Sequence, residues 1–343
     1  MEFKNIDCAL IKDASNLFYY TRYSNSDALL ILTENKKYYL TDARYIQEAH
    51  ENLFGFEIID INRDLFGALK AILSEGKYRR IGYEGNCPLN FYSELTQNIK
   101  GVEFVEIGKE IAFERSIKTE EEIQLIKKAQ AITDKTFEDI LPLIKEGMTE
   151  IELGRILNDL LYQNGADQAA FESIVAFGPN SAKPHALKTK TKLKNNSVIK
   201  VDFGAKYKGY CSDMTRTVFF GGASQKQKEI YQHVLNAQNA ALENVYTGIG
   251  CPSAYALAND YFVKENLDKY FLHSLGHGIG VDVHERPALS PKSNEILQEN
   301  MVVSIEPGLY YINEFGIRIE DIILFKKTTV ENLTKSVKQM IIL

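Results

Sequence analysis

The first third of the chain alternates between short apolar runs and amphipathic segments. The pattern predicts strands over 28–32, 37–40 and 80–84, a helix that begins at 41–45 and a second helix over 64–73. Thr41 or Asp42 is the expected N-cap of the first helix, because either side chain can accept a hydrogen bond from the first turn. Strands that alternate with helices indicate a small α/β domain that ends near residue 116.

Three longer amphipathic helices are predicted in the rest of the chain. Thr119 with Glu122, and Thr149 with Glu152, have the spacing of capping boxes at the starts of two of them. The third helix is expected over 225–245. Strand-like segments, many of them carrying acidic residues, lie between and after these helices, which favours an α+β fold for this part.

Composition places the chain among ordinary globular proteins. It has 343 residues, 45% hydrophobic and 25% charged, which is a length typical of two domains. The net charge of −6 argues against a nucleic-acid partner. No uncharged apolar run approaches the roughly 18 residues of a membrane span, and the N-terminal residues lack the apolar core of a secretory signal. Four cysteines, widely separated, are expected to be free thiols in a cytoplasmic protein.

A pair of apolar strands carries two aspartates in an unusual position. The strands are expected over 198–204 and 210–219. A turn centred between Tyr207 and Lys208 would place Asp202 opposite Asp213, with their Cβ atoms about 4.5–5.5 Å apart. Two like charges at that distance repel each other unless a cation lies between them. In another register, one aspartate would be a turn or surface residue.

A second acidic hairpin is expected near the end of the chain. Its strands are predicted over 302–306 and 316–324. Arg318 and Glu320 would point to one face and Ile317 and Ile319 to the other. Glu306 ends the outgoing strand, and a lone glutamate there is usually structural. Acids embedded in apolar strands are costly to bury without partners, so the second hairpin favours a shared site.

Histidine and glycine are concentrated between the two hairpins. Three of the six histidines, His273, His277 and His284, lie within twelve residues of one another. The interleaved glycines disfavour a helix, and no Rossmann strand–turn–helix surrounds them. A lone histidine is most often a core residue, but a glycine-rich cluster of three favours a ligand-binding role. His185 is a fourth candidate.

The charged residues together suggest a metal centre. Asp202, Asp213, Glu306 and Glu320 supply four negative charges and His277 a neutral nitrogen, a set that two divalent cations would neutralise. An oxygen-rich set with one imidazole suits Mn²⁺, with Zn²⁺ or Co²⁺ as alternatives. Two such ions can polarise a carbonyl and lower the pKa of water, which is the chemistry of a metal hydrolase.

Five segments, taken in order, resemble one protein family. They are 181–185, 201–217, 273–285, 305–310 and 316–321, and the segments 27–32 and 41–45 fit its amino-terminal domain. The chain resembles the pita-bread-fold metallopeptidases, in the branch of aminopeptidase P and prolidase. The resemblance implies a creatinase-like α/β domain over 1–116 and a pita-bread catalytic domain over 117–343.

The resemblance also implies roles for individual residues. The two-metal ligands of the family fall on Asp202, Asp213, His277, Glu306 and Glu320, the set that the charge argument selects. His185, His273 and His284 would bind substrate and stabilise the tetrahedral intermediate. Glu306 would also move the proton of the attacking water, and Arg318 would pair with acids or with substrate. Tyr310 is a candidate pocket residue.

The resemblance implies hydrolysis of the bond between an N-terminal residue and a following proline, which is the reaction of an Xaa-Pro aminopeptidase. It also implies that the protein forms a homodimer. The chain is short for the larger aminopeptidases P, so an Xaa-Pro dipeptidase is the first alternative. A peptide-binding scaffold of the same fold and a metal-free creatinase-like hydrolase would both lack the ligand acids that are present here. Methionine aminopeptidase would lack the large amino-terminal domain.

Overall fold

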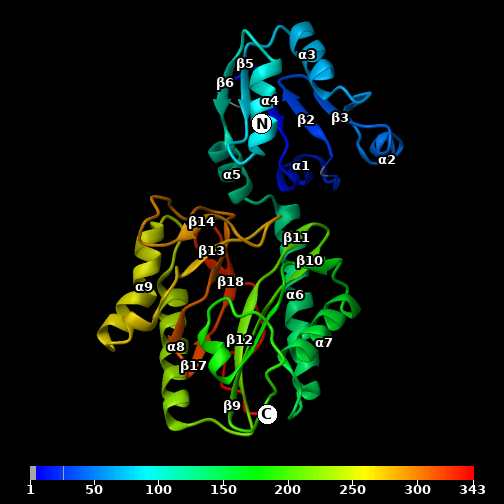
Figure 1. Cartoon of the computed structure of the whole chain (residues 1–343). Coiled ribbons are helices and arrows are strands. Elements are labelled where there is room, and N and C mark those ends of the chain that lie inside the picture. The colour runs from blue at the N-terminus through cyan, green and yellow to red at the C-terminus, as the bar shows by residue number, and fades with distance from the viewer. Residues whose placement is uncertain (1–4, 26) are drawn as a thin grey trace. The chain divides into compact units, whose positions relative to one another are not determined.

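The computed structural model describes residues 5–25 and 27–343 (Figure 1). The chain divides into two units, of which the first ends at Arg115 and the second spans Ser116–Leu343. A small α/β unit is followed by an α+β unit, so the expected fold class is confirmed. Across the described ranges, none of the helices has both the length and the apolar character that crossing a bilayer requires.

The first unit is a mixed sheet with helices on both faces. Its strand order is β4-β3-β2-β1-β5-β6. Alternation along β1 explains the two layers: Cys8 and Leu10 join one apolar cluster, and Ala9 and Ile11 join the other. The elements are β1 (Cys8–Ile11), α1 (Ala14–Thr21), β2 (Leu29–Thr33), β3 (Lys37–Thr41), α2 (Ile46–Asn52), β4 (Glu57–Asp60), α3 (Leu65–Glu75), β5 (Arg80–Tyr83), α4 (Leu89–Asn98), β6 (Glu103–Glu106) and α5 (Gly108–Ser116).

The predicted start of the helix that follows β3 is wrong. Thr41 is the last residue of β3, and α2 begins only at Ile46. The carboxylate of Asp42 accepts a hydrogen bond of 2.9 Å from the backbone N–H of Arg44. Asp42 therefore closes a local turn, which is the competing use of such side chains, and it caps no helix.

Two pairs of helices enclose the strands of the second unit (Figure 1). α6 (Glu120–Ile140) and α7 (Glu150–Gln163) both begin with the predicted capping boxes, which are confirmed. α8 (Gln225–Asn244) matches the third predicted helix. α9 (Cys251–Lys264), whose first turn contains a proline, was not predicted.

The strands of the second unit form short antiparallel sheets with the orders β12-β9-β8, β14-β13-β15-β18-β19, β11-β10-β7 and β16-β17. Their bounds are β7 (Gln168–Ala169), β8 (Ile174–Phe177), β9 (Ser197–Phe203), β10 (Ala205–Tyr207), β11 (Tyr210–Cys211), β12 (Met214–Phe220), β13 (Gly276–Gly278), β14 (Glu285–Leu289), β15 (Val302–Ile305), β16 (Gly308–Tyr311), β17 (Phe315–Arg318), β18 (Asp321–Phe325) and β19 (Val330–Asn332). One apolar cluster joins α6 and α7 to β8, β9 and β12, and another joins α8 and α9 to the later strands.

The first acidic hairpin has a different register from the predicted one. Asp202 lies opposite Thr215 and not opposite Asp213. The turn is centred on Lys208 and Gly209, whose φ angles of 45° and 82° suit a two-residue turn that needs positive φ at both positions. This displaces the pairing by two residues. Because side chains alternate with a period of two, Asp213 moves to a diagonal position near Asp202.

The second acidic hairpin is interrupted in the middle. Ile305 pairs with Asp321 in one ladder, and Gly308 pairs with Arg318 in the next. The two ladders are in register, so Glu306 and Glu320 face each other across the interruption. The predicted hairpin is therefore present as two short ladders with both glutamates in the gap between them.

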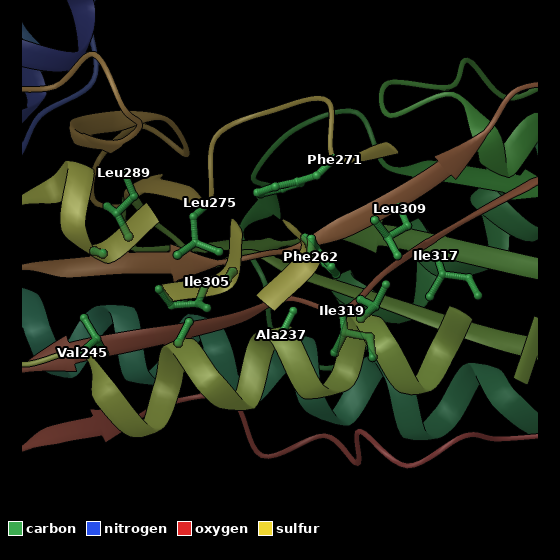
Figure 2. Close-up of a cluster of buried hydrophobic side chains, with 14 of the residues drawn as sticks. Ala237, Val245, Phe262, Phe271, Leu275, Leu289, Ile305, Leu309, Ile317 and Ile319 are labelled. Carbon is green, nitrogen blue, oxygen red and sulfur yellow. The ribbon is translucent and has the colours of Figure 1, made fainter. Parts of the chain in front are cut away.

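A buried glutamine on α8 supports this gap. The side-chain amide of Gln238 donates to the carbonyls of Ile305 and Ile319, at 3.1 and 3.2 Å. These residues immediately precede Glu306 and Glu320. Figure 2 shows α8 passing beneath Ile305 and Ile319, with Ala237 beside them. Gln238 thus fixes the backbone from which both glutamates extend.

Replacing Gln238 by leucine should lower the free energy of unfolding by about 2–4 kcal/mol, because two buried carbonyls lose their donor. Urea unfolding measures the loss. Gln232→Leu, on the same helix but exposed, is the control and should change stability by less than about 0.5 kcal/mol. Equal effects of the two substitutions would show that Gln238 does not support the gap.

Candidate metal centre

Three of the predicted ligands converge in the second unit. A carboxylate oxygen of Asp213, a carboxylate oxygen of Glu320 and a ring nitrogen of His277 all lie within 4.8 Å of one another. Asp213 follows β11, His277 lies in β13 and Glu320 links β17 to β18. Three separate chain segments thus present one ligand atom each to a common point.

Two carboxylate oxygens at this point lack a hydrogen-bond donor in the described part of the chain. Among the described residues, Asp213 Oδ1 and Glu320 Oε1 are buried and accept no hydrogen bond. Burial and the charges of neighbouring carboxylates raise the pKa of Asp213 and of Glu320 well above the usual range. Buried lone pairs without donors, in a set of repelling acids, fit a divalent cation.

The ring of His277 is oriented for ligation. Its Nδ1 lies 3.1 Å from the carbonyl oxygen of Gly278, which can only accept, so Nδ1 carries the proton. Nε2 then points toward the acids, 3.3 Å from Glu306 and 3.7 Å from Asp213, and without its proton it would offer a lone pair to a cation. A backbone carbonyl that fixes the ring in this way is the usual support of a metal-binding histidine.

Glu306 and Asp202 complete the predicted ligand set at its edge. Burial opposes ionisation of Glu306, but the hydrogen bond and charge of His277 outweigh it and lower the pKa of Glu306 to about 2. The Ser304 hydroxyl also donates to Glu306 at 3.3 Å. Asp202 accepts a very short hydrogen bond from the guanidinium of Arg318. Both acids therefore adjoin the three convergent residues but are held by other side chains as well.

A chain of hydrogen bonds runs behind the acids. Arg318 Nη1 donates to the hydroxyl of Tyr310 at 2.8 Å, and that hydroxyl lies 2.8 Å from His273 Nε2. The Nδ1 of His273 lies 2.7 Å from the carbonyl of Ser274, so Nδ1 is protonated and Nε2 accepts from Tyr310. Both nitrogens of His273 are therefore engaged within the protein.

The remaining two histidines lie nearer to solvent. The ring centroid of His284 is 4.2 Å from that of His277. Burial lowers the pKa of His284, and the charges of His277 and His185 lower it further, which also places His185 nearby. His185 itself is exposed. These two rings are the ones in the set that a substrate could reach.

Sequence reasoning missed three residues that support the acids. Thr215 donates its hydroxyl to Glu320 at 2.8 Å and accepts from Arg318 Nε at 2.9 Å. Gln238 holds the backbone before the glutamates, and Lys200 lies fully buried two residues before Asp202. Only Lys200 had a readable signal, since it is a lysine within a largely apolar strand.

Most of the chain matches two known protein families. Residues 124–327 match the model of metallopeptidase family M24, and residues 1–117 match the creatinase/prolidase N-terminal domain. An Xaa-Pro dipeptidase of Pyrococcus horikoshii is 35% identical over 99% of this chain and 96% of its own.

Solved structures extend the similarity to the fold. An Xaa-Pro dipeptidase from Bacillus anthracis is 34% identical, with a TM-score of 0.95 over 98% of this chain and 95% of its own. An X-Pro aminopeptidase from Thermotoga maritima is 32% identical, with a TM-score of 0.92 over 98% of both chains.

The repulsion among the acids predicts an unusual pH dependence. Asp213 and Glu320 bind protons more tightly in the folded than in the unfolded chain, and the pKa of His277 is also raised, by Glu306 and against the effect of burial. Metal-stripped protein should therefore lose stability as the pH rises from about 5 to 8, by up to about 1.4 kcal/mol per pH unit for each such group. Urea unfolding across that range measures it.

Asp213→Asn removes one of the repelling charges and should flatten this profile, whereas excess Mn²⁺ should reverse it for the unaltered protein. Asp260→Asn, at an exposed position on α9, is the control and should leave the slope unchanged. A metal-stripped protein that gains stability as the pH rises would contradict the proposed repulsion.

Proposed function

The chain belongs to metallopeptidase family M24, and we propose that this Xaa-Pro peptidase acts as an aminopeptidase, which removes the N-terminal residue of peptides with proline in second position. The observation that carries the proposal is the convergence of Asp213, His277 and Glu320, with two buried oxygens that accept no hydrogen bond from the described residues. Homodimer formation and a cytoplasmic location remain predictions.

Asp202, Asp213, His277, Glu306 and Glu320 are the residues proposed to hold two divalent ions. Four carboxylates and one imidazole favour Mn²⁺, while Zn²⁺ and Co²⁺ are possible alternatives. When bound, such ions supply a Lewis acid for the scissile carbonyl and make water acidic enough to lose a proton near neutral pH.

Glu306 is the proposed proton carrier. Its low pKa keeps it ionised at neutral pH, so it can accept a proton from the attacking water. The nitrogen of proline in the scissile bond carries no hydrogen and must gain a proton to leave as an amine. Glu306 would return the proton to that nitrogen as the C–N bond breaks. His185 and His284 would hydrogen-bond the carbonyl oxygen as it gains negative charge.

The partners of the buried cations favour an aminopeptidase. A dipeptide would bring a free carboxylate next to the scissile bond. Yet the lysines and arginines that are buried in the described part of the second unit all bond to groups of the chain itself: Lys118 to Glu285, Lys200 to three carbonyls, Arg216 to Asp321 and Arg318 to Asp202. Peptides that continue beyond the proline need no such cation.

An Xaa-Pro dipeptidase is the second candidate. The relative from Pyrococcus horikoshii and the structure from Bacillus anthracis both carry that name and cover nearly the whole chain. In this case an exposed cation or a histidine at the rim would have to bind the carboxylate of the dipeptide.

Glu306→Gln should reduce kcat by about 10²–10⁴-fold or more, because it removes the proton acceptor together with a ligand charge. Steady-state hydrolysis of an Xaa-Pro-Yaa peptide with added Mn²⁺ measures the loss. Glu299→Gln, at an exposed position before β15, is the control. Turnover by Glu306→Gln within tenfold of the unaltered enzyme would exclude Glu306 as the proton carrier.

A series of substrates of increasing length decides between the two activities. An aminopeptidase should have a kcat/KM at least tenfold higher for Xaa-Pro-Yaa and longer peptides than for Xaa-Pro, because only the dipeptide has to desolvate a carboxylate in the site. The series is measured with Mn²⁺, Co²⁺ and Zn²⁺ in turn. Preference for the dipeptide would favour the dipeptidase, and cleavage of neither class at full metal occupancy would exclude both.

A further inference from the structure

One lysine lies fully buried on the face of β9 that carries Asp202. Lys200 has an exposed fraction of 0%, and it shares this face with Asp202 because the two are separated by two residues along a strand. A buried lysine is rare and costs free energy unless its ammonium is fully hydrogen-bonded.

The ammonium of Lys200 is saturated by one short segment of backbone. Its Nζ donates to the carbonyls of Ser181, Lys183 and Pro184, at 3.0, 2.6 and 3.3 Å. An ammonium has three N–H groups, so none is left for a substrate or for an acid. Lys200 is therefore not a substrate-binding residue.

The segment that Lys200 holds leads directly to His185. Arg318 Nη1 donates to the same Pro184 carbonyl at 3.2 Å, and the backbone N–H of Gly316 donates to the Ser181 hydroxyl at 2.9 Å. The segment is thus fastened on both sides of Lys183, while His185 follows it and is exposed. A fixed backbone immediately before an exposed histidine restricts where its imidazole can lie.

Lys200 also contacts the series of hydrogen bonds behind the acids, which links Arg318, Tyr310 and His273. Its Nζ lies 5.2 Å from the centroid of the Tyr310 ring, within the range of a cation–π contact. The hydroxyl of that ring joins Arg318 to His273. One ammonium therefore touches both supports of the site, the backbone before His185 and the ring of Tyr310.

We infer that Lys200 is a positioning residue, which holds the 181–184 backbone and the Tyr310 ring so that His185 and the Tyr310 hydroxyl keep their places beside the metal ligands. This inference rests on the proposed function. Its chemistry is that of an internal ammonium in a cage of carbonyl oxygens, and it acts through His185 and Tyr310 with no contact to substrate.

The test compares Lys200→Met, which keeps the length of the side chain and removes all N–H donors, with Lys200→Gln, which keeps two of them. Lys200→Met should lower kcat for an Xaa-Pro-Yaa peptide about 10- to 100-fold, the loss expected from a displaced active-site group, while Mn²⁺ content and affinity stay at the unaltered level. Lys200→Gln should lose less. Lys188→Met, which removes a lysine just beyond His185 that binds the carbonyl of Ser173, is the matched control.

A readout independent of activity uses protein with ¹⁵N-labelled histidine. The ring resonances of His185 and His273 should shift or broaden in Lys200→Met and stay unchanged in Lys188→Met. In Lys200→Ala, added ethylammonium should restore part of the lost kcat, because it can donate to the carbonyls, and tetramethylammonium should not.

The possible results separate the inference from the proposed function. If the unaltered protein cleaves no Xaa-Pro peptide, the proposed function fails, and the histidine resonances still test the position of Lys200. If the enzyme is active and Lys200→Met is within twofold of it, with unchanged histidine resonances, the inference is wrong. It is also wrong if neither variant folds with full metal content, since Lys200 would then serve folding alone.

Discussion

Repulsion among buried carboxylates is the constraint on which the second unit depends. Beyond the effect of burial, the charges of Asp202 and Glu306 raise the pKa of both Asp213 and Glu320, and the charge of Glu320 raises that of Asp213 further. The chain compensates part of this charge with Arg318, which bonds to Asp202, and leaves the point between Asp213, His277 and Glu320 for cations. A protein that binds its metal in this way is less stable in the metal-free state, and it becomes more stable when the ions bind.

The fold accommodates this repulsion because its sheets are interrupted near the metal ligands. A Cβ atom on Gly204 would lie 1.9 Å from the carbonyl oxygen of Ser212, and one on Gly276 would lie 1.9 Å from that of Ser304. The close approach at these glycines brings Asp213 and His277 inward, where a regular strand would keep its neighbours apart. Since interrupted ladders leave carbonyls without donors, buried side chains such as Gln238 replace the missing backbone N–H groups.

The sequence predicted which faces carry the ligands better than it predicted their register. The turn at Lys208 and Gly209 moves the pairing of Asp202 by two residues, yet Asp213 stays on the same face because side chains alternate with a period of two. The capping boxes at Thr119 and Thr149 were readable because they depend on residues only three apart. The partners of Lys200 and Gln238 were not readable, because they are backbone carbonyls, which no residue type reveals.

The bonding of the buried cations within the chain also affects how a substrate would be recognised. The N–H groups of Arg318 and Lys200 donate hydrogen bonds to Asp202, Tyr310 and the backbone before His185. These bonds use every N–H group of Lys200 and most of those of Arg318, so little capacity remains to pair with a charged peptide. If the proposed function holds, discrimination among peptides falls to groups that remain accessible, among them His185 and His284, which are both exposed. An interior that orders the acids and a rim with two exposed histidines follow from one distribution of cations.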